Sequence, residues 1–351
     1  MKWPLLTLMC LMPFVASVAV VPDLIVQGND KKAHGDLKGA IAAYTAAIAQ
    51  NPKDAKAYMA RATVLGLEGN FDAAMADDTQ AITLDPKSAM AFSNRGNARM
   101  SKGDLAGAMA DYTQAIALDP KHVLAFNNRG NIKNLQKDYR GAIADYTQAL
   151  TLDPKNAAAY YNRAGAERSI GDYADAEADY SQALVLNKID VPAYLNRAIL
   201  RIAQHNWDGA TADLNTCLTL LPEERQVYPR VFLWVIASEH PASNKTTLPL
   251  TDYLNHGSSK FEGTWPWQIA KFLAGQVDEA TFLASAKSFE AKKDKGQVAQ
   301  AYYYAGLKQV LVGDKAAAVK FFKQCQQSGN RSLHEFVLAR EAMKSLGGQS
   351  K

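Results

Sequence analysis

Cysteine is scarce in this sequence, with three residues among 351. That number excludes a disulfide scaffold and a cysteine-rich zinc domain. An excess of one charge is also lacking, because 39 lysines and arginines stand against 35 aspartates and glutamates. A net charge of +4 gives no reason to predict nucleic acid as a partner. Since 48% of the residues are hydrophobic, we expect a folded chain with several domains or one elongated array.

Recognisable catalytic and metal-binding motifs are missing as well. The six histidines have no metal-ligand spacing, and none lies beside a cysteine or serine in a nucleophile motif. A glycine-rich phosphate loop needs a preceding strand, and no segment has a convincing strand pattern. We therefore expect a protein that is not an enzyme and that uses no metal and no cofactor.

Charged residues are absent between Lys2 and Asp23. This apolar stretch, with small residues before Ala19, is typical of a secretory signal peptide cleaved after Ala19. We expect residues 1–19 to be removed, which leaves a periplasmic or secreted bacterial protein with no stable membrane insertion. The stretch is also long enough to span a bilayer, so an uncleaved N-terminal membrane anchor is the alternative. Cys10 lies inside the apolar stretch and lacks the small residues of a lipid-attachment motif.

Proline recurs with a period of 34 residues. The prolines on this register are Pro52, Pro86, Pro120, Pro154 and, after one step without proline, Pro222. The period divides residues 20–224 into six repeats, the first of which begins at residue 21. Self-similarity at this period indicates an array of helix–turn–helix repeats.

The same positions of each repeat carry small or aromatic residues. Position 8 is glycine or alanine, position 20 is always alanine, and positions 4 and 24 are mostly aromatic, as at Phe92 and Tyr112. Small residues at fixed spacing let two antiparallel helices approach closely around the aromatic rings. Pairs such as Gly103-Asp104 separate the two helices, because glycine suits a left-handed C-cap and aspartate suits a helix start.

These residues resemble those of the tetratricopeptide repeat (TPR) family. The resemblance implies an all-α fold, a right-handed TPR superhelix (α-solenoid) whose first helices line a concave groove, with a degenerate helical C-terminal part. The pattern returns in 299–332, which we expect to be a further TPR unit. Residues 225–298 are expected to form a degenerate helical segment, and 333–351 a capping helix and tail.

The C-terminal third resembles bacterial NlpI-like periplasmic TPR proteins. The resemblance rests on the Trp265-Pro266-Trp267 turn, Phe272-Leu273-Ala274-Gly275 and Ala301-Tyr302-Tyr303-Tyr304-Ala305-Gly306. It implies an adaptor for cell-envelope enzymes such as cell-wall hydrolases and proteases. The missing lipid-attachment motif means that membrane attachment is not carried over.

Three functional interpretations follow. The first is an exported, non-enzymatic scaffold or adaptor that binds an extended segment of a partner protein in the concave groove. The second is cell-wall or carbohydrate binding through residues 225–351, which hold 17 basic and 10 acidic side chains, together with Trp234, Trp265 and Trp267. A core role for these tryptophans is the structural alternative, as is a solvated loop for the lysines of 287–295. The third is an intracellular adaptor with an unprocessed N-terminus.

Asparagines mark the expected peptide-binding groove. If positions 4, 8 and 11 of a first helix face its partner helix, positions 5, 6 and 9 turn toward the concave side. We expect peptide contacts from Asn94, Asn97, Asn127, Asn128, Asn131, Asn162 and Asn196. An amide side chain offers two donors and an acceptor to a peptide bond, so the peptide would be read through its backbone. The alternative is that these amides are merely solvated.

Arginine at position 7 and aspartate at position 23 occur together in repeats two to six. The arginines are Arg61, Arg95, Arg129, Arg163 and Arg197, and the aspartates are Asp77, Asp111, Asp145, Asp179 and Asp213. The first repeat lacks both, so we expect a contact within each repeat or with the next one. The arginines are then structural. Cys217 and Cys325 share packing position 27 and are expected to be buried free thiols.

Overall fold

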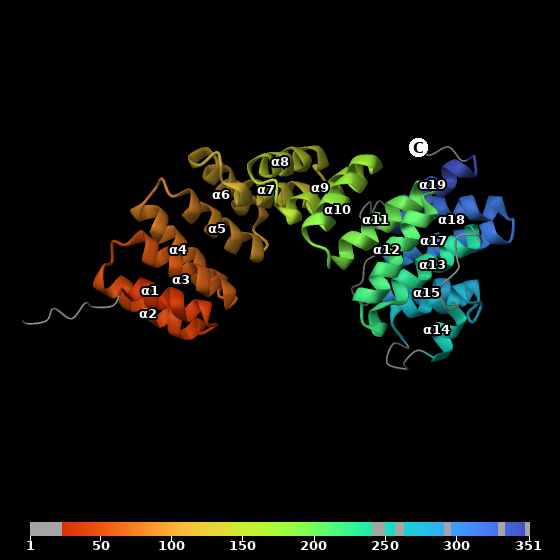
Figure 1. The fold of residues 1–351 in the computed structure, drawn as a ribbon, viewed down its shortest axis with the longest axis horizontal. Helices are drawn as coiled ribbons and strands as arrows, with labels where there is room; N and C mark the ends of the chain where they lie inside the picture. Colours follow the sequence, from red (N-terminus) through yellow and green to blue (C-terminus); the bar gives the residue numbers. More distant parts are fainter. Residues whose placement is uncertain (1–22, 241–249, 257–262, 291–295, 329–333, 348–351) are drawn as a thin grey trace, which may run out of the picture. The chain divides into compact units, whose positions relative to one another are not determined.

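The structure is a computed structural model that describes residues 23–240, 250–256, 263–290, 296–328 and 334–347. Over these ranges it contains nineteen α-helices, one short 3-10 helix and no strand (Figure 1). The all-α fold expected from the sequence is therefore confirmed. The predicted signal peptide and the lysines at 292, 293 and 295 lie outside the described residues.

The first twelve helices form six consecutive helix–turn–helix pairs, one in each expected repeat. They are α1 (Leu24–Ala33), α2 (Leu37–Gln50), α3 (Ala55–Leu67), α4 (Phe71–Leu84), α5 (Ala89–Ser101), α6 (Leu105–Leu118), α7 (Val123–Leu135), α8 (Tyr139–Leu152), α9 (Ala157–Ile170), α10 (Tyr173–Leu186), α11 (Val191–Ala203) and α12 (Trp207–Leu220). In each pair, the two helices contact each other.

Seven helices follow a 3-10 turn at Glu223–Arg225. They are α13 (Val227–Glu239), α14 (Leu250–His256), α15 (Trp265–Leu273), α16 (Glu279–Glu290), α17 (Gln297–Leu311), α18 (Lys315–Gln327) and α19 (His334–Ser345). The pair α17 and α18 lies in the segment where the repeat pattern returns, and Gly313 between them has a φ of 84°.

The turn residues set the ends of the helices as the sequence indicates. Gly103 has a φ of 83°, which a residue with a Cβ rarely adopts. The side chain of Asp104 then accepts a hydrogen bond of 2.9 Å from the backbone N–H of Gly107 in the first turn of α6. Asp36 does the same for α2, with its carboxylate 2.9 Å from the Gly39 nitrogen.

Glycine at position 8 lets the two helices of a repeat approach closely. A Cβ on Gly96 would lie 2.8 Å from Cε1 of Tyr112, whose ring is fully buried at position 24. Gly306 and Phe322 repeat the arrangement, at 2.7 Å, in the pair α17 and α18. The aromatic ring therefore occupies the space that the missing Cβ leaves.

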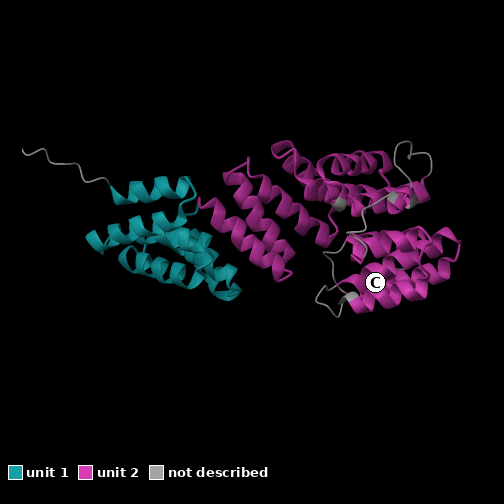
Figure 2. Cartoon of the chain, turned by 90° about the horizontal axis from the view of Figure 1, so that it is seen from below, with its two compact units in different colours: residues 1–120 teal, residues 121–351 magenta. Residues whose placement is uncertain are grey.

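The chain divides into two compact units, residues 1–120 and 121–351 (Figure 2). The first contains α1 to α6 and the second contains α7 to α19. This division between the third and fourth helix pairs was not expected from the sequence, in which the repeat pattern continues without a break.

The second unit ends in an aromatic core built from the degenerate segment and α17 to α19. Trp265 and Trp267 are 4% and 2% exposed, and the rings of Phe272 and Phe282 stack with their centroids 4.2 Å apart. Tyr304 is also fully buried. These side chains fill the core, so they are not available for stacking against a sugar at the surface.

The two cysteines of the described chain are buried free thiols, Cys217 in α12 and Cys325 in α18. Burial raises the pKa of the Cys217 thiol to about 12 and raises that of Cys325 as well. Both thiols are therefore held in the protonated, unreactive form.

Candidate peptide-binding site

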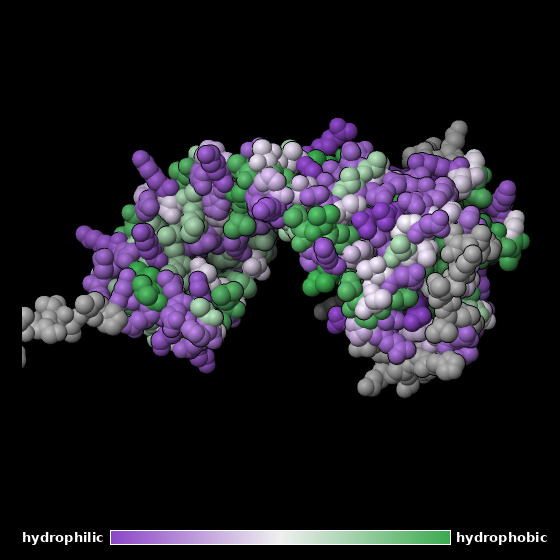
Figure 3. Space-filling view, viewed as in Figure 1, coloured by the Kyte–Doolittle hydropathy of each residue, from purple (hydrophilic) through white to green (hydrophobic). Residues whose placement is uncertain are grey.

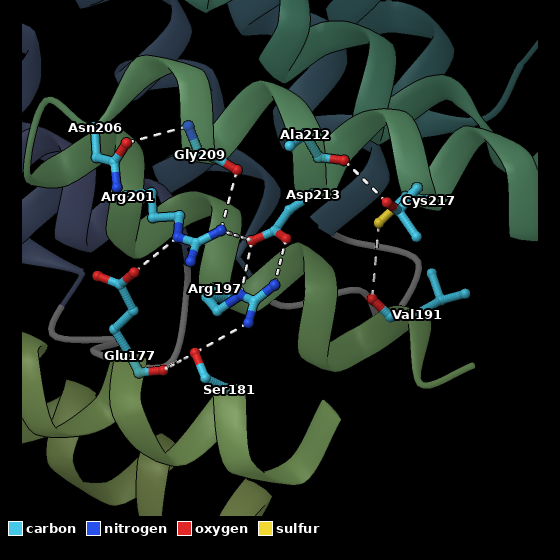
Figure 4. Close-up of polar contacts among 11 residues, drawn as sticks. Glu177, Ser181, Val191, Arg197, Arg201, Asn206, Gly209, Ala212, Asp213 and Cys217 are labelled. Carbon is cyan, nitrogen blue, oxygen red and sulfur yellow. Dashed lines mark hydrogen bonds and ion pairs between the residues drawn. The ribbon is translucent and has the colours of Figure 1, made fainter. Parts of the chain in front are cut away.

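The arginines at position 7 bind the aspartates at position 23 within the same repeat. In the fourth repeat, Arg129 donates from Nε and Nη2 to the two oxygens of Asp145, at 2.9 and 2.7 Å. Figure 4 shows the equivalent pair of the sixth repeat, in which Asp213 accepts hydrogen bonds from both Arg197 and Arg201. Of the two arrangements left open by the sequence, the structure has the contact within the repeat.

Four of these arginines also reach the preceding repeat. Arg61 donates from Nη1 to the Thr45 hydroxyl at 3.1 Å, and the corresponding bonds join Arg95 to Thr79, Arg163 to Thr147 and Arg197 to Ser181. Each guanidinium also lies 5.5–5.8 Å from the centroid of the aromatic ring at position 4. The arginines are therefore committed to the fold and do not form a basic binding surface.

The asparagines at position 9 hold the tyrosines at position 24. Tyr112 donates its hydroxyl proton to Oδ1 of Asn97 at 2.7 Å, and Tyr146 donates to Oδ1 of Asn131 at 2.8 Å. The sequence analysis missed this pairing. Its signal was the recurrence of asparagine and tyrosine fifteen residues apart.

Three of the expected groove residues of the second unit, Asn127, Asn131 and Asn162, lie close together. Asn162 donates from Nδ2 to Oδ1 of Asn131 at 3.0 Å and to Oδ1 of Asn127 at 3.5 Å. Asn128 is half-buried and Asn127 is 9% exposed. The structure thus brings together the amides of α7 and α9, although several of their polar atoms already bind each other.

Asn196 lies beneath the C-terminal helix α19. It is 8% exposed, and its Nδ2 donates to the Tyr161 hydroxyl at 3.0 Å. Its Oδ1 accepts from Nη1 of Arg168 at 3.0 Å and lies 2.9 Å from Nε2 of His334, a residue of α19. Burial, followed by the nearby Arg168, lowers the pKa of His334 to about 3, so the imidazole is neutral. A ligand could reach the Asn196 amide only by displacing α19.

A pocket lies between α3, α4 and α5 of the first unit. We call it the Asp78 pocket, and it is lined by Ala62, Thr63, Gly66, Leu67, Phe71, Ala74, Asp78, Asn94, Asn97, Ala98 and Ser101. Its volume is about 240 Å³. The pocket therefore brings two of the expected groove residues, Asn94 and Asn97, to one cavity between the first helices of successive repeats.

Asp78 occupies position 24, where four other repeats have tyrosine. In the next repeat the residues at positions 8, 9 and 24 are Gly96, Asn97 and Tyr112, and the tyrosine ring fills the space between the helices. The second repeat instead has Ala62, Thr63 and Asp78 at these positions. The pocket occupies the place of the missing ring. Sequence analysis could have found it from the interruption in the tyrosine series.

Asp78 is 1% exposed, and its Oδ1 has no hydrogen-bond partner among the described residues. Burial raises the pKa of this carboxyl group from 3.8 to about 8. The negative charges of Asp77 and Asp111 raise this pKa further, whereas the positive charge of Arg95 lowers it. Asp78 is therefore mostly protonated near neutral pH.

Apolar side chains also reach the surface beside the pocket. Leu67, which lines it, is 64% exposed. On the molecular face drawn in Figure 3, hydrophobic residues lie in small groups among hydrophilic ones. An exposed leucine next to a cavity offers apolar area to a ligand that enters it.

The described residues form neither a metal-binding cluster nor a membrane-spanning helix. No three or more histidine, cysteine, aspartate or glutamate side chains lie together as a metal site in the described ranges. None of the helices within those ranges combines the length and the apolar composition needed to cross a membrane.

Family models of the tetratricopeptide repeat match four segments of the chain. One, described as a TPR repeat, matches residues 96–134, and three described as tetratricopeptide repeats match 25–89, 123–156 and 145–178. These segments are therefore tetratricopeptide repeats, as the sequence pattern predicts. No curated protein sequence matches the chain.

Several solved structures share the fold. The chain is similar to PilF of Pseudomonas aeruginosa, with 19% identity, a TM-score of 0.52 and coverage of 63% of this chain and 97% of that one. For PilW, a type IV pilus biogenesis factor, the identity is 20%, the TM-score 0.51 and the coverage 57% and 97%. For the APC/C hetero-tetramer Cut9–Hcn1 the identity is 21% and the TM-score 0.51, with coverage of 57% of this chain and 40% of that one. These similarities establish a solenoid of TPR helices.

Proposed function

We propose that this protein is a non-enzymatic adaptor that binds an extended segment of a partner protein along the first helices of its repeats. We further propose that it is exported by its N-terminal signal peptide and that its partners are cell-envelope proteins, including the enzymes that NlpI-like adaptors serve. The repeats themselves support the first part, since TPR solenoids are generally scaffolds.

The Asp78 pocket is the observation that carries the proposal. It lies between α3 and α5, the first helices of two successive repeats, and it combines apolar walls with the polar groups of Asn94 and Asn97. A cleft with apolar walls and a few convergent polar groups is the usual form of a binding site. A peptide that crosses α3 and α5 would place one side chain in the pocket and its backbone beside the amide of Asn94.

The second compact unit offers amides to a peptide on α7 and α9. Asn128, Asn131 and Asn162 lie on these two helices, and Asn162 donates to Oδ1 of Asn131 at 3.0 Å. Asn196 is excluded from this role while α19 covers it, because its amide oxygen and nitrogen bind groups of the protein itself. We therefore expect one binding surface on α3 and α5 of the first unit and, separately, one on α7 and α9 of the second unit.

Crosslinking capture from the native host, with the purified chain as bait, tests the proposal. Once a partner is identified, Asn94→Ala, Asn128→Ala and Asn162→Ala together should weaken binding tenfold or more, about 1.4 kcal/mol. The helical content should not change, because none of these residues caps a helix.

A control exists on the second helices of repeats two to four, two of which also carry an asparagine substitution. Gln80, Gln114 and Gln148 are exposed amides at position 26 of repeats two to four. Changing all three to alanine removes the same number of side-chain amides but should leave partner binding unchanged. Unaltered affinity in the folded asparagine variant, or equal loss in both variants, would contradict the proposed binding surface.

A further inference from the structure

The Asp78 pocket has a chemical preference that the proposed adaptor role does not specify. Asp78 is buried and its Oδ1 has no hydrogen-bond partner among the described residues, while five of the eleven lining residues are alanine, leucine or phenylalanine. A buried acceptor that forms no hydrogen bond raises the free energy of the folded state. A ligand that brings a donor to this oxygen would remove that cost.

The arginines around the pocket do not supply this donor. Arg61 binds both oxygens of Asp77 at 2.7 Å, and Arg95 binds both oxygens of Asp111 at 3.0 and 2.7 Å. Arg99 also donates to Asp111, at 2.8 Å. Each neighbouring cation is therefore engaged with a carboxylate other than Asp78.

The shape and lining of the pocket suit a long aliphatic side chain with a positive end. A cavity of about 240 Å³ is larger than an engineered cavity of about 150 Å³ that binds benzene. Lysine buries its methylene stem along apolar surface and keeps a compact ammonium group with three donors at its tip. Ala62, Leu67 and Phe71 would contact the stem, and Thr63, which also lines the pocket, carries a hydroxyl oxygen that can accept a hydrogen bond.

We infer that the Asp78 pocket receives a lysine side chain of the partner segment, with its ammonium group bound to the Asp78 carboxylate, which releases its proton to solvent as the cation binds. This inference rests on the proposed adaptor function and adds specificity to a surface that otherwise reads a peptide through its backbone. Arginine is a poorer fit, because its guanidinium is a wide planar group that binds best to several acceptors in one plane, whereas the lysine ammonium is a compact point charge. An aromatic ring could fill the volume, but it would cover the carboxyl group without giving it a cation.

Capped alanine pentapeptides with a central lysine, norleucine or tyrosine test this preference without knowledge of the partner. Each is titrated into the full chain while the backbone amide resonances of α3, α4 and α5 are followed by NMR. The lysine peptide should perturb residues of the pocket and bind at least tenfold more tightly than the norleucine peptide, which has a similar stem but no charge.

Two variants of the chain complete the experiment. Asp78→Asn keeps the size of the side chain and removes its charge, so the preference for lysine over norleucine should disappear. The triple variant Ala62→Gly, Thr63→Asn and Asp78→Tyr restores the residues of the third repeat. It should fill the pocket with a tyrosine ring and abolish binding of all three peptides while preserving the fold.

Several results would overturn the inference. They are equal binding of the lysine and norleucine peptides, a preference for tyrosine, a lysine preference that survives Asp78→Asn, and no perturbation of pocket residues by millimolar peptide. Failure of the proposed adaptor surface has a different signature, which is unchanged partner affinity in the folded asparagine variant. If Asp78→Asn leaves partner affinity unchanged while the asparagine variant weakens it, the pocket assignment is wrong and the adaptor function stands.

Discussion

The Arg129–Asp145 pair predicts that removing the aspartate destabilises the protein more than removing the arginine. Asp145 accepts two hydrogen bonds from Arg129, and its Oδ2 also lies 2.7 Å from the ammonium nitrogen of Lys133. The Asp145 side chain is 6% exposed, against 18% for Arg129 and 23% for Lys133. One carboxylate therefore neutralises two partly buried cations.

Replacing each partner by leucine should have unequal effects. Asp145→Leu leaves two cations without a counter-charge and should destabilise the protein by about 3–5 kcal/mol. Arg129→Leu leaves Asp145 paired with Lys133 and should cost less, about 1–3 kcal/mol. In the double variant only Lys133 is left unpaired, so the two losses should not add, and the coupling free energy should be about 1–3 kcal/mol.

Native-state hydrogen exchange of the backbone amides in α7 and α8 gives the free energy of local opening in each variant, and thermal unfolding followed by circular dichroism gives the global effect. Lys133→Met serves as the control for the second cation, and it should make Arg129→Leu as damaging as Asp145→Leu. Additive effects of the two leucine substitutions would refute the inferred contact. Equal single effects in the presence of Lys133 would refute the role assigned to the lysine.

Three further predictions follow from single features. Gly96→Ala should destabilise the protein by about 1–3 kcal/mol in urea unfolding, because its Cβ would overlap a buried ring, whereas Gly165→Ala, with its nearest neighbour at 3.9 Å, should be neutral or stabilising. The raised pKa of Asp78 means that the folded state keeps a proton that the unfolded state releases, so its contribution should fall as pH rises from about 4 to about 8. Relative to the wild type, Asp78→Asn should therefore gain up to roughly 5 kcal/mol between pH 4 and pH 9, and a constant difference would contradict the shift. N-terminal sequencing of protein made in a bacterial host should find a chain that begins after Ala19, and a cytoplasmic chain that still begins at Met1 would contradict export.

The sequence determined the features that depend on local geometry repeated at a fixed period. Glycine followed by aspartate set the turn at Gly103 whatever the surroundings, because left-handed backbone and helix capping are properties of one turn. The joint presence of arginine and aspartate predicted a contact such as Arg129–Asp145, because residues that repeat together across a two-helix hairpin stay at the same relative place. The same turn residues and the same arginine–aspartate pair recur in several repeats, so each occurrence is further evidence for the predicted contact.

Tertiary structure alone decided which of the expected groove residues stay accessible. Asn94 and Asn196 occupy the same position of their repeats, yet one borders a pocket and the other is covered by α19. The contact of Asn196 with His334 joins residues 138 positions apart, and no periodic pattern encodes it. The break in the tyrosine series at Asp78 was visible in the sequence, but a missing ring leaves a cavity only where neighbouring helices do not close the gap. Whether they close it depends on how α3, α4 and α5 pack together, which is a property of the folded chain.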